Sequence, residues 1–144
     1  MTTGTPLHIA RTEDFATCLG LRMEVFVAEQ GVPAEVENDH EDTGAVHLLA
    51  RLGGKPVGTA RVMRDGATGK IGRVCVLKHL RGTGLGLALM QAALDELRAM
   101  GGINRVILGA QVSALPFYAR LGFSPYGEAF DSVGIAHVMM ERAL

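Results

Sequence analysis

Three glycines follow a single arginine in the stretch RGTGLG, residues 81–86. Glycine lets a backbone approach a ligand without a Cβ in the way, and an arginine can donate charge-assisted hydrogen bonds to phosphate. From Leu87 onward, apolar residues recur every three or four positions, which predicts a helix that begins in this stretch. The unpaired N–H groups at a helix start favour an anion. The stretch is therefore either an anion-binding loop or a plain glycine turn.

Two familiar phosphate-binding loops do not match this stretch. A Walker loop ends in Gly-Lys-Ser/Thr, which is absent here. A dinucleotide fingerprint needs Gly-x-Gly-x-x-Gly, and counting from either Gly82 or Gly84 the last position is leucine. The pattern that does fit is Arg-x-x-Gly-x-Gly, with Arg81, Gly84 and Gly86.

Composition limits the classes of protein to which the chain can belong. Its 144 residues are 48% hydrophobic and 20% charged, which indicates one globular domain over residues 1–144. A net charge of −1 gives no reason to expect a nucleic acid or an anionic membrane as partner. Cys18 and Cys75 have no metal-ligand spacing, so we expect reduced thiols and no metal. Neither a signal-peptide core nor a membrane-length apolar run is present, which predicts a cytoplasmic protein.

The residues of interest need a scaffold, and the pattern predicts a mixed α/β sheet in the order β–α–β–β–β–α–β–α–β. Antiparallel hairpins come first and a βαβ unit follows. Thr12 is expected to be the N-cap of the first helix, which Gly31 and Pro33 end, and residues 34–45 form an acidic, irregular connection or at most one helical turn. The strands are predicted at residues 7–11, 45–52, 56–63, 71–77, 105–111 and 134–142, with a further candidate near 124–127; the helices are predicted from 13, from 87 and from 113.

Two separate motifs resemble the GNAT superfamily of acyl-CoA-dependent N-acyltransferases. The stretch at residues 81–86 resembles its pyrophosphate loop, and ALPFYARLGF (114–123) resembles its later signature, a helix that bears Phe-Tyr and ends in Leu-Gly-Phe. One helix and one strand separate the motifs, as that fold requires. Over nearly the whole chain the sequence is similar to the YjcF/ElaA-like group of small bacterial GNAT proteins, departing at Ala136, where that group usually has proline.

The resemblance implies a splayed, V-shaped cleft between the strand at 71–77 and the strand at 105–111. Acetyl-CoA, the implied cosubstrate, would lay its pantetheine arm along the first of these strands and its pyrophosphate on the glycine loop. The implied cofactor-binding residues are Val74, Cys75, Val76, Arg81, Gly82, Thr83, Gly84, Leu85, Gly86, Gln111 and Tyr118.

Acetyl transfer to an amine makes demands on the site that particular residues could meet. The amine must lose a proton before it can attack, and the departing thiol can need one. By resemblance, Tyr118 is the candidate acid, with a packed aromatic ring as the alternative. Glu29 and His137 are the candidate bases. The alternatives are that Glu29 caps the helix or pairs locally with Arg22, and that His137 is a structural histidine.

The leading functional hypothesis is direct transfer of an acetyl group to the primary amine of a small metabolite. A protein N-terminus or lysine side chain is a second acceptor class, and a non-catalytic acyl-CoA-binding module is a third hypothesis. An acyl-homoserine-lactone synthase is disfavoured, because the chain has no tryptophan. Residues 34–45 either attract a cationic amine or form a solvated loop. Members of the superfamily often form homodimers, although no segment here marks an interface.

Overall fold

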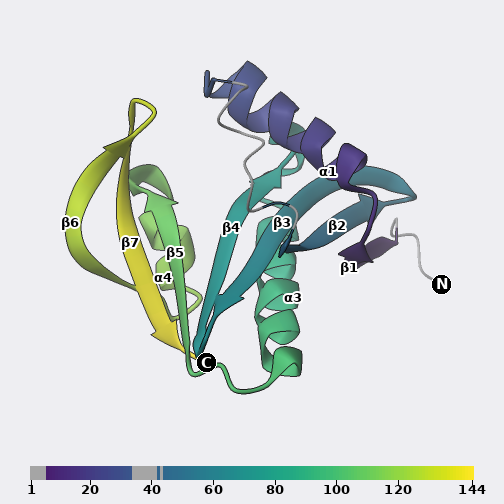
Figure 1. The fold of residues 1–144 in the computed structure, drawn as a ribbon. Coiled ribbons are helices and arrows are strands. Elements are labelled where there is room, and N and C mark those ends of the chain that lie inside the picture. Colours follow the sequence, from purple (N-terminus) through teal and green to yellow (C-terminus); the bar gives the residue numbers. More distant parts are fainter. Residues whose placement is uncertain (1–5, 34–41, 43) are drawn as a thin grey trace.

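The computed structural model describes residues 6–33, 42 and 44–144. Within these ranges, seven strands form one mixed sheet in the order β1-β2-β3-β4-β5-β7-β6 (Figure 1). Neighbouring strands are antiparallel except β4 and β5, which are parallel. The strands are β1 (Leu7–Thr12), β2 (Val46–Leu52), β3 (Lys55–Asp65), β4 (Thr68–Val76), β5 (Arg105–Gln111), β6 (Ser124–Ser132) and β7 (Ile135–Ala143). The predicted mixed α/β fold is confirmed.

Helices cover both faces of strands β2–β4, as Figure 1 shows. The covering helices are α1 (Phe15–Arg22) and η1 (Met23–Glu29) on one face and α3 (Leu85–Met100) on the other. Other helices are η3 (Lys78–Leu80), η4 (Val112–Ala114), which contacts β7, and α4 (Leu115–Ala119), which contacts β5. Side chains alternate across a strand, so Leu48 and Ala50 join the core cluster that contains α3, while Leu49 packs with Cys18 and Leu21 of α1. The alternation fixes which helix covers which face.

The parallel strands β4 and β5 separate soon after they meet. Along these two fully described strands the ladder ends with the pair Lys70 and Ile107. The register of β4 against β3 then shifts between Thr59 and Arg61, and opposite this shift Arg73 has a φ of +50°. Because a β-bulge bends its strand, β4 turns away from β5 and the sheet opens as a V (Figure 1).

The first helix ends just before Gly31, as that glycine and Pro33 predict, but it differs from its prediction in its N-cap and in its winding. Asp14 is its N-cap and accepts from the Thr17 amide, whereas Thr12, the predicted cap, accepts from the amide of Asp14 itself, before the helix begins. Beyond Arg22 the helix continues as the π-helix η1, where the Gln30 amide donates to the Val25 carbonyl over 3.1 Å. β6 is a full strand rather than the short candidate near 124–127.

One residue of the predicted acidic connection is described, and it is buried. The Asp42 carboxylate, 7% exposed, accepts from both Arg22 Nη atoms at 2.9 and 3.1 Å and from Arg61 Nη1 at 3.2 Å. Its backbone carbonyl accepts from His47 Nε2 at 3.0 Å. Asp42 is therefore neither part of a solvated loop nor exposed to an approaching amine. Residues 34–41 and 43 lie outside the described residues.

The turn between β6 and β7 holds a valine in an unfavourable conformation. Val133 has a φ of +48° and is followed by Gly134 at +83°, as in a type I′ turn, where asparagine is preferred and a β-branched residue is strained. Val133 is also 46% exposed, so little packing offsets the strain. We expect Val133→Asn to raise the free energy of unfolding by about 1 kcal/mol, measured by urea denaturation.

A matched change tests the conformational origin of that gain. Val112, 42% exposed and outside the positive-φ residues, should gain nothing from the same substitution to asparagine. An equal gain at both positions would mean that replacing an exposed valine by a polar side chain is sufficient, and that relief of backbone strain is not the cause.

Candidate active site

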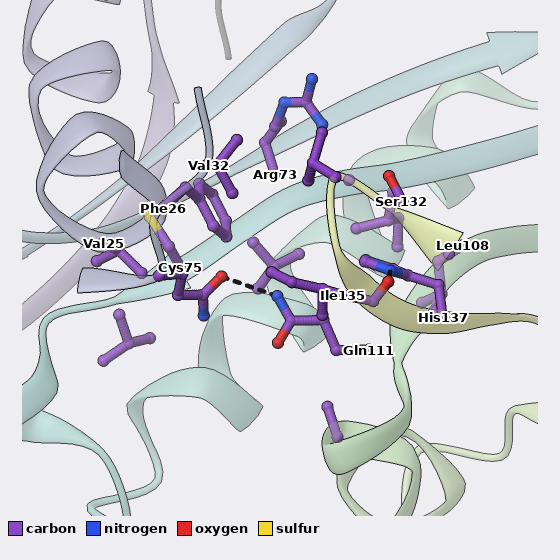
Figure 2. A pocket seen from close by; sticks show the side chains of 18 of the residues that line it. Val25, Phe26, Val32, Arg73, Cys75, Leu108, Gln111, Ser132, Ile135 and His137 are labelled. Carbon is purple, nitrogen blue, oxygen red and sulfur yellow. Dashed lines mark hydrogen bonds between the residues drawn. The ribbon is translucent and has the colours of Figure 1, made fainter. Parts of the chain in front are cut away.

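A cavity of about 420 Å³ lies where β4 and β5 diverge (Figure 2). Its walls come from these two strands, from the end of η1, from α4 and from the β6–β7 turn. The sequence-predicted site residues that line it are Val74, Cys75, Val76, Arg81, Gln111, Tyr118 and His137. Glu29 and residues 82–86 are not among its described lining residues. The cavity thus gathers the predicted residues of β4, β5, α4 and β7, and from the stretch at residues 81–86 it is lined by Arg81.

The glycine loop leads directly into α3. Gly84 is the N-cap, with a φ of +90°, and no side chain caps the first turn of the helix. A Cβ added at Gly82 (φ +80°) or Gly84 would meet no atom within 4 Å, so there is open space beside the backbone at both positions. Glycine is needed at these two positions because their φ angles are positive. A helix N-terminus without a side-chain cap, next to glycines with open space beside them, fits a diphosphate. Gly86 differs, because its Cβ would lie 3.4 Å from the Phe117 ring where α3 approaches α4.

Arg81 is held by an ion pair that joins distant parts of the chain. Its two Nη atoms donate to both carboxylate oxygens of Glu29, the Nη2–Oε1 distance being 2.8 Å. Its Nε and Nη2 also donate to the Val76 carbonyl at 3.2 and 3.1 Å. The hydrogen bond from Arg81 lowers the pKa of Glu29 below its ordinary value. Glu29 therefore pairs with Arg81 rather than with Arg22, and as a carboxylate of lowered pKa it is a weak base.

Gln111 connects β5 to the helix on the other side of the cleft. Its Nε2 donates to Gln30 Oε1 over 2.9 Å, the dashed contact in Figure 2. It does not cap the following turn with its side chain. Gln30 also lines the cavity, and it is a site residue that the sequence motifs do not reveal. Nothing in the sequence around Gln30 indicates this contact, because its partner Gln111 is 81 residues away.

His137 faces Gln111 across the β5–β7 ladder and points into the cavity (Figure 2). Its Nδ1 lies 2.7 Å from the Ile135 carbonyl oxygen, and its ring stacks on Phe130 with centroids 5.8 Å apart. A carbonyl oxygen only accepts, so Nδ1 carries the hydrogen and Nε2 of the neutral ring holds a lone pair. That arrangement suits a proton acceptor.

Tyr118 lines the cavity from α4. Its ring packs edge-on against Phe117 and Phe123, with centroids 5.0 and 6.2 Å away. Among the described residues its hydroxyl has no hydrogen-bond partner. Burial raises the pKa of Tyr118 to about 12, so the phenol keeps its proton at any ordinary pH. The side chain can therefore donate a hydrogen bond to a group in the cavity.

Two structural features bear on other kinds of site. In the part of the chain that the structure describes, no three His, Cys, Asp or Glu side chains gather as they would around a metal ion. None of the described helices is long and apolar enough to cross a membrane.

Comparison with known proteins identifies relatives along nearly the whole chain. A family model described as an acetyltransferase (GNAT) domain matches residues 11–144. The Bacillus subtilis protein named uncharacterized N-acetyltransferase YjcF is 42% identical over 85% of this chain and 87% of its own length. The crystal structure of Escherichia coli ElaA superposes with a TM-score of 0.83 at 30% identity, covering 96% of this chain and 99% of that one. The crystal structure of an acyl-CoA N-acyltransferase from Pseudomonas aeruginosa superposes with a TM-score of 0.77 at 29% identity. The match covers 97% of this chain and 100% of that one.

Proposed function

The chain is an acetyltransferase that belongs to the GNAT family, and we propose that it moves an acetyl group from acetyl-CoA to the primary amine of a small metabolite. The observation that carries this proposal is a single cavity, at the divergence of β4 and β5, lined by both His137 and Tyr118. One side chain can take a proton and the other can donate a hydrogen bond, so transfer can be direct, in a ternary complex.

The residues present fit acetyl-CoA, which supplies an activated thioester when bound. The uncapped N–H groups after Gly82 and Gly84 would hold the diphosphate, with Thr83, Leu85 and Gly86 completing the loop. The backbone of β4 at Val74, Cys75 and Val76 lines the cavity and would hold the pantetheine arm. We do not assign a covalent role to Cys75, because direct transfer requires none.

We assign the base to His137. Its Nε2 would accept the proton that the amine loses as the C–N bond forms and the C–S bond breaks. Glu29 is the weaker candidate, because both of its oxygens already accept from Arg81 and its pKa is lowered. Tyr118 would donate to the departing sulfur.

The raised pKa of Tyr118 limits how much it can contribute. A phenol of pKa about 12 is a weaker acid than a thiol of pKa about 8.5, so we expect hydrogen-bond donation to the sulfur rather than full proton transfer ahead of C–S cleavage. A hydrogen bond to a charged group contributes about 1.5–3 kcal/mol. Tyr118→Phe should therefore lower kcat about 10- to 100-fold, measured at saturating substrates. Unchanged turnover would remove Tyr118 from the reaction.

Ligand binding is the first test of the proposed function. Acetyl-CoA at about one hundred times its Kd should stabilise the protein by about 2.7 kcal/mol, whereas NAD and ATP should not. Small primary amines, peptide N-termini and lysine peptides are then compared as acceptors by following thiol release. Acetylation of peptides alone would replace the small-molecule acceptor, binding without transfer to any acceptor would indicate an acyl-CoA-binding module, and no stabilisation at millimolar acetyl-CoA would contradict the proposal itself.

A further inference from the structure

Two adjacent residues at the end of η1 contact the two diverging arms of the cleft. Glu29, the last residue of η1, pairs with Arg81 in the segment that follows β4. Gln30, the next residue, accepts a hydrogen bond from Gln111 at the end of β5. The end of η1 therefore connects two strands whose own ladder has already stopped at Lys70 and Ile107.

The contact with Arg81 is geometrically well defined. Two parallel N–H···O bonds to one carboxylate fix both the distance and the plane of the guanidinium. The two further bonds to the Val76 carbonyl hold the same guanidinium against the end of β4. Arg81 is thus anchored on both sides, and its own backbone begins the loop at residues 81–86.

We propose that Glu29 is a positioning residue for the cofactor, which acts through Arg81 to hold the loop at residues 81–86 at a fixed separation from η1. The diphosphate of acetyl-CoA can then bind the loop while its thioester lies in the cavity, because the distance between the two is fixed. This inference rests on the proposed function only in taking acetyl-CoA as the ligand.

If only charge mattered, Glu29 would weaken the binding of acetyl-CoA rather than support it. A carboxylate beside an anionic ligand repels it, and this carboxylate also occupies an arginine that could otherwise turn to the phosphates. If Arg81 acted by itself on the diphosphate, removing the charge of Glu29 would tighten acetyl-CoA binding. The positioning role predicts weaker binding, so the sign of the change decides between the two.

The experiment measures the Kd of acetyl-CoA by titration calorimetry for the wild-type protein, Glu29→Gln, Arg81→Ala and the double variant. We expect Glu29→Gln to weaken binding about 5- to 10-fold, the scale of a well-aligned ion pair. The double variant should bind no more weakly than Arg81→Ala, because the two residues act as one unit. Glu24→Gln is the matched control: the same change on an exposed residue of the same helix, expected to leave the Kd unchanged.

A truncated ligand separates positioning of the loop from a general loosening of the cleft. S-acetylpantetheine carries the thioester but no diphosphate, so its Kd should be the same for the wild type and for Glu29→Gln. Equal weakening of both thioesters, or unchanged or tighter binding of acetyl-CoA by Glu29→Gln, would overturn the proposal. If the wild type binds no acetyl-CoA, the proposed function fails together with it, whereas binding that Glu29→Gln leaves intact contradicts only the positioning role.

Discussion

His137→Ala should lower kcat about 100- to 10,000-fold, the range that a positioned proton acceptor contributes, while the Kd of acetyl-CoA stays unchanged. The reason is that Nδ1 is engaged with the Ile135 carbonyl, which leaves Nε2 as the ring nitrogen with an available lone pair on a residue that lines the cavity. Without this lone pair the amine must lose its proton to water. Single-turnover kinetics with saturating acetyl-CoA and the best acceptor of the amine panel measure the loss.

Two further measurements separate a chemical role of His137 from a structural one. Added imidazole should restore part of the activity of His137→Ala, because it supplies the missing base to the vacated space. His8→Ala removes an exposed histidine of β1, outside the cavity, and should leave kcat unaffected. If Glu29→Gln lowered kcat by a comparable factor and His137→Ala did not lower it, Glu29 would be the base.

Asp42→Ala should lower the free energy of unfolding by about 3–5 kcal/mol, the cost of removing one partner from a buried charge pair. Arg22 and Arg61, 1% and 5% exposed, both donate to the Asp42 carboxylate. Urea denaturation at neutral pH measures the change. If the alanine variant does not fold, Asp42→Asn, which keeps one acceptor oxygen and loses the charge, gives the measurement.

The same cluster predicts how stability depends on pH. Burial raises the pKa of Asp42, but the hydrogen bonds and charges of Arg22 and Arg61 outweigh it, and the net pKa lies below the ordinary value. A lowered pKa in the folded state gives stability that is present above the unfolded pKa of about 3.9 and is lost as pH falls through the folded pKa. The wild type should therefore lose stability at acid pH in a step that Asp42→Asn lacks.

The matched control for Asp42 is Asp65→Asn, because Asp65 is exposed at the end of β3. Surface changes of this kind alter stability by less than about 0.5 kcal/mol. If both substitutions cost the same, the cluster of Arg22, Asp42 and Arg61 would have no special role.

The sequence carried a sign of this cluster that pattern reasoning could not complete. Arg22 falls at a position where the helix otherwise repeats apolar residues, and a charge there needs a buried partner. Its partner is Asp42, 20 residues later and inside a run of acidic residues. Nothing local distinguishes Asp42 from its acidic neighbours, because the choice depends on where the chain returns over the sheet.

The π-helix η1 is a second feature that only the tertiary structure decided. Apolar spacing from Phe15 to Phe26 predicts a helix, but it gives no sign of the π winding that begins at Met23. The π turn directs Glu29 and Gln30 toward Arg81 and Gln111, which are 52 and 81 residues away. Contacts at such separations leave no local pattern.

By itself the sequence determined the order of the strands and helices and the family, because hydrophobic periodicity and the motifs at residues 81–86 and 114–123 are local. It also predicted which strands would border the cleft, and the structure places Tyr118 and His137 in one cavity there. The tertiary structure alone decided which charges pair and what holds the cleft together. Those outcomes depend on the bulge at Arg73, on the winding of η1 and on the burial of Asp42, and each is set by packing between segments far apart in the chain.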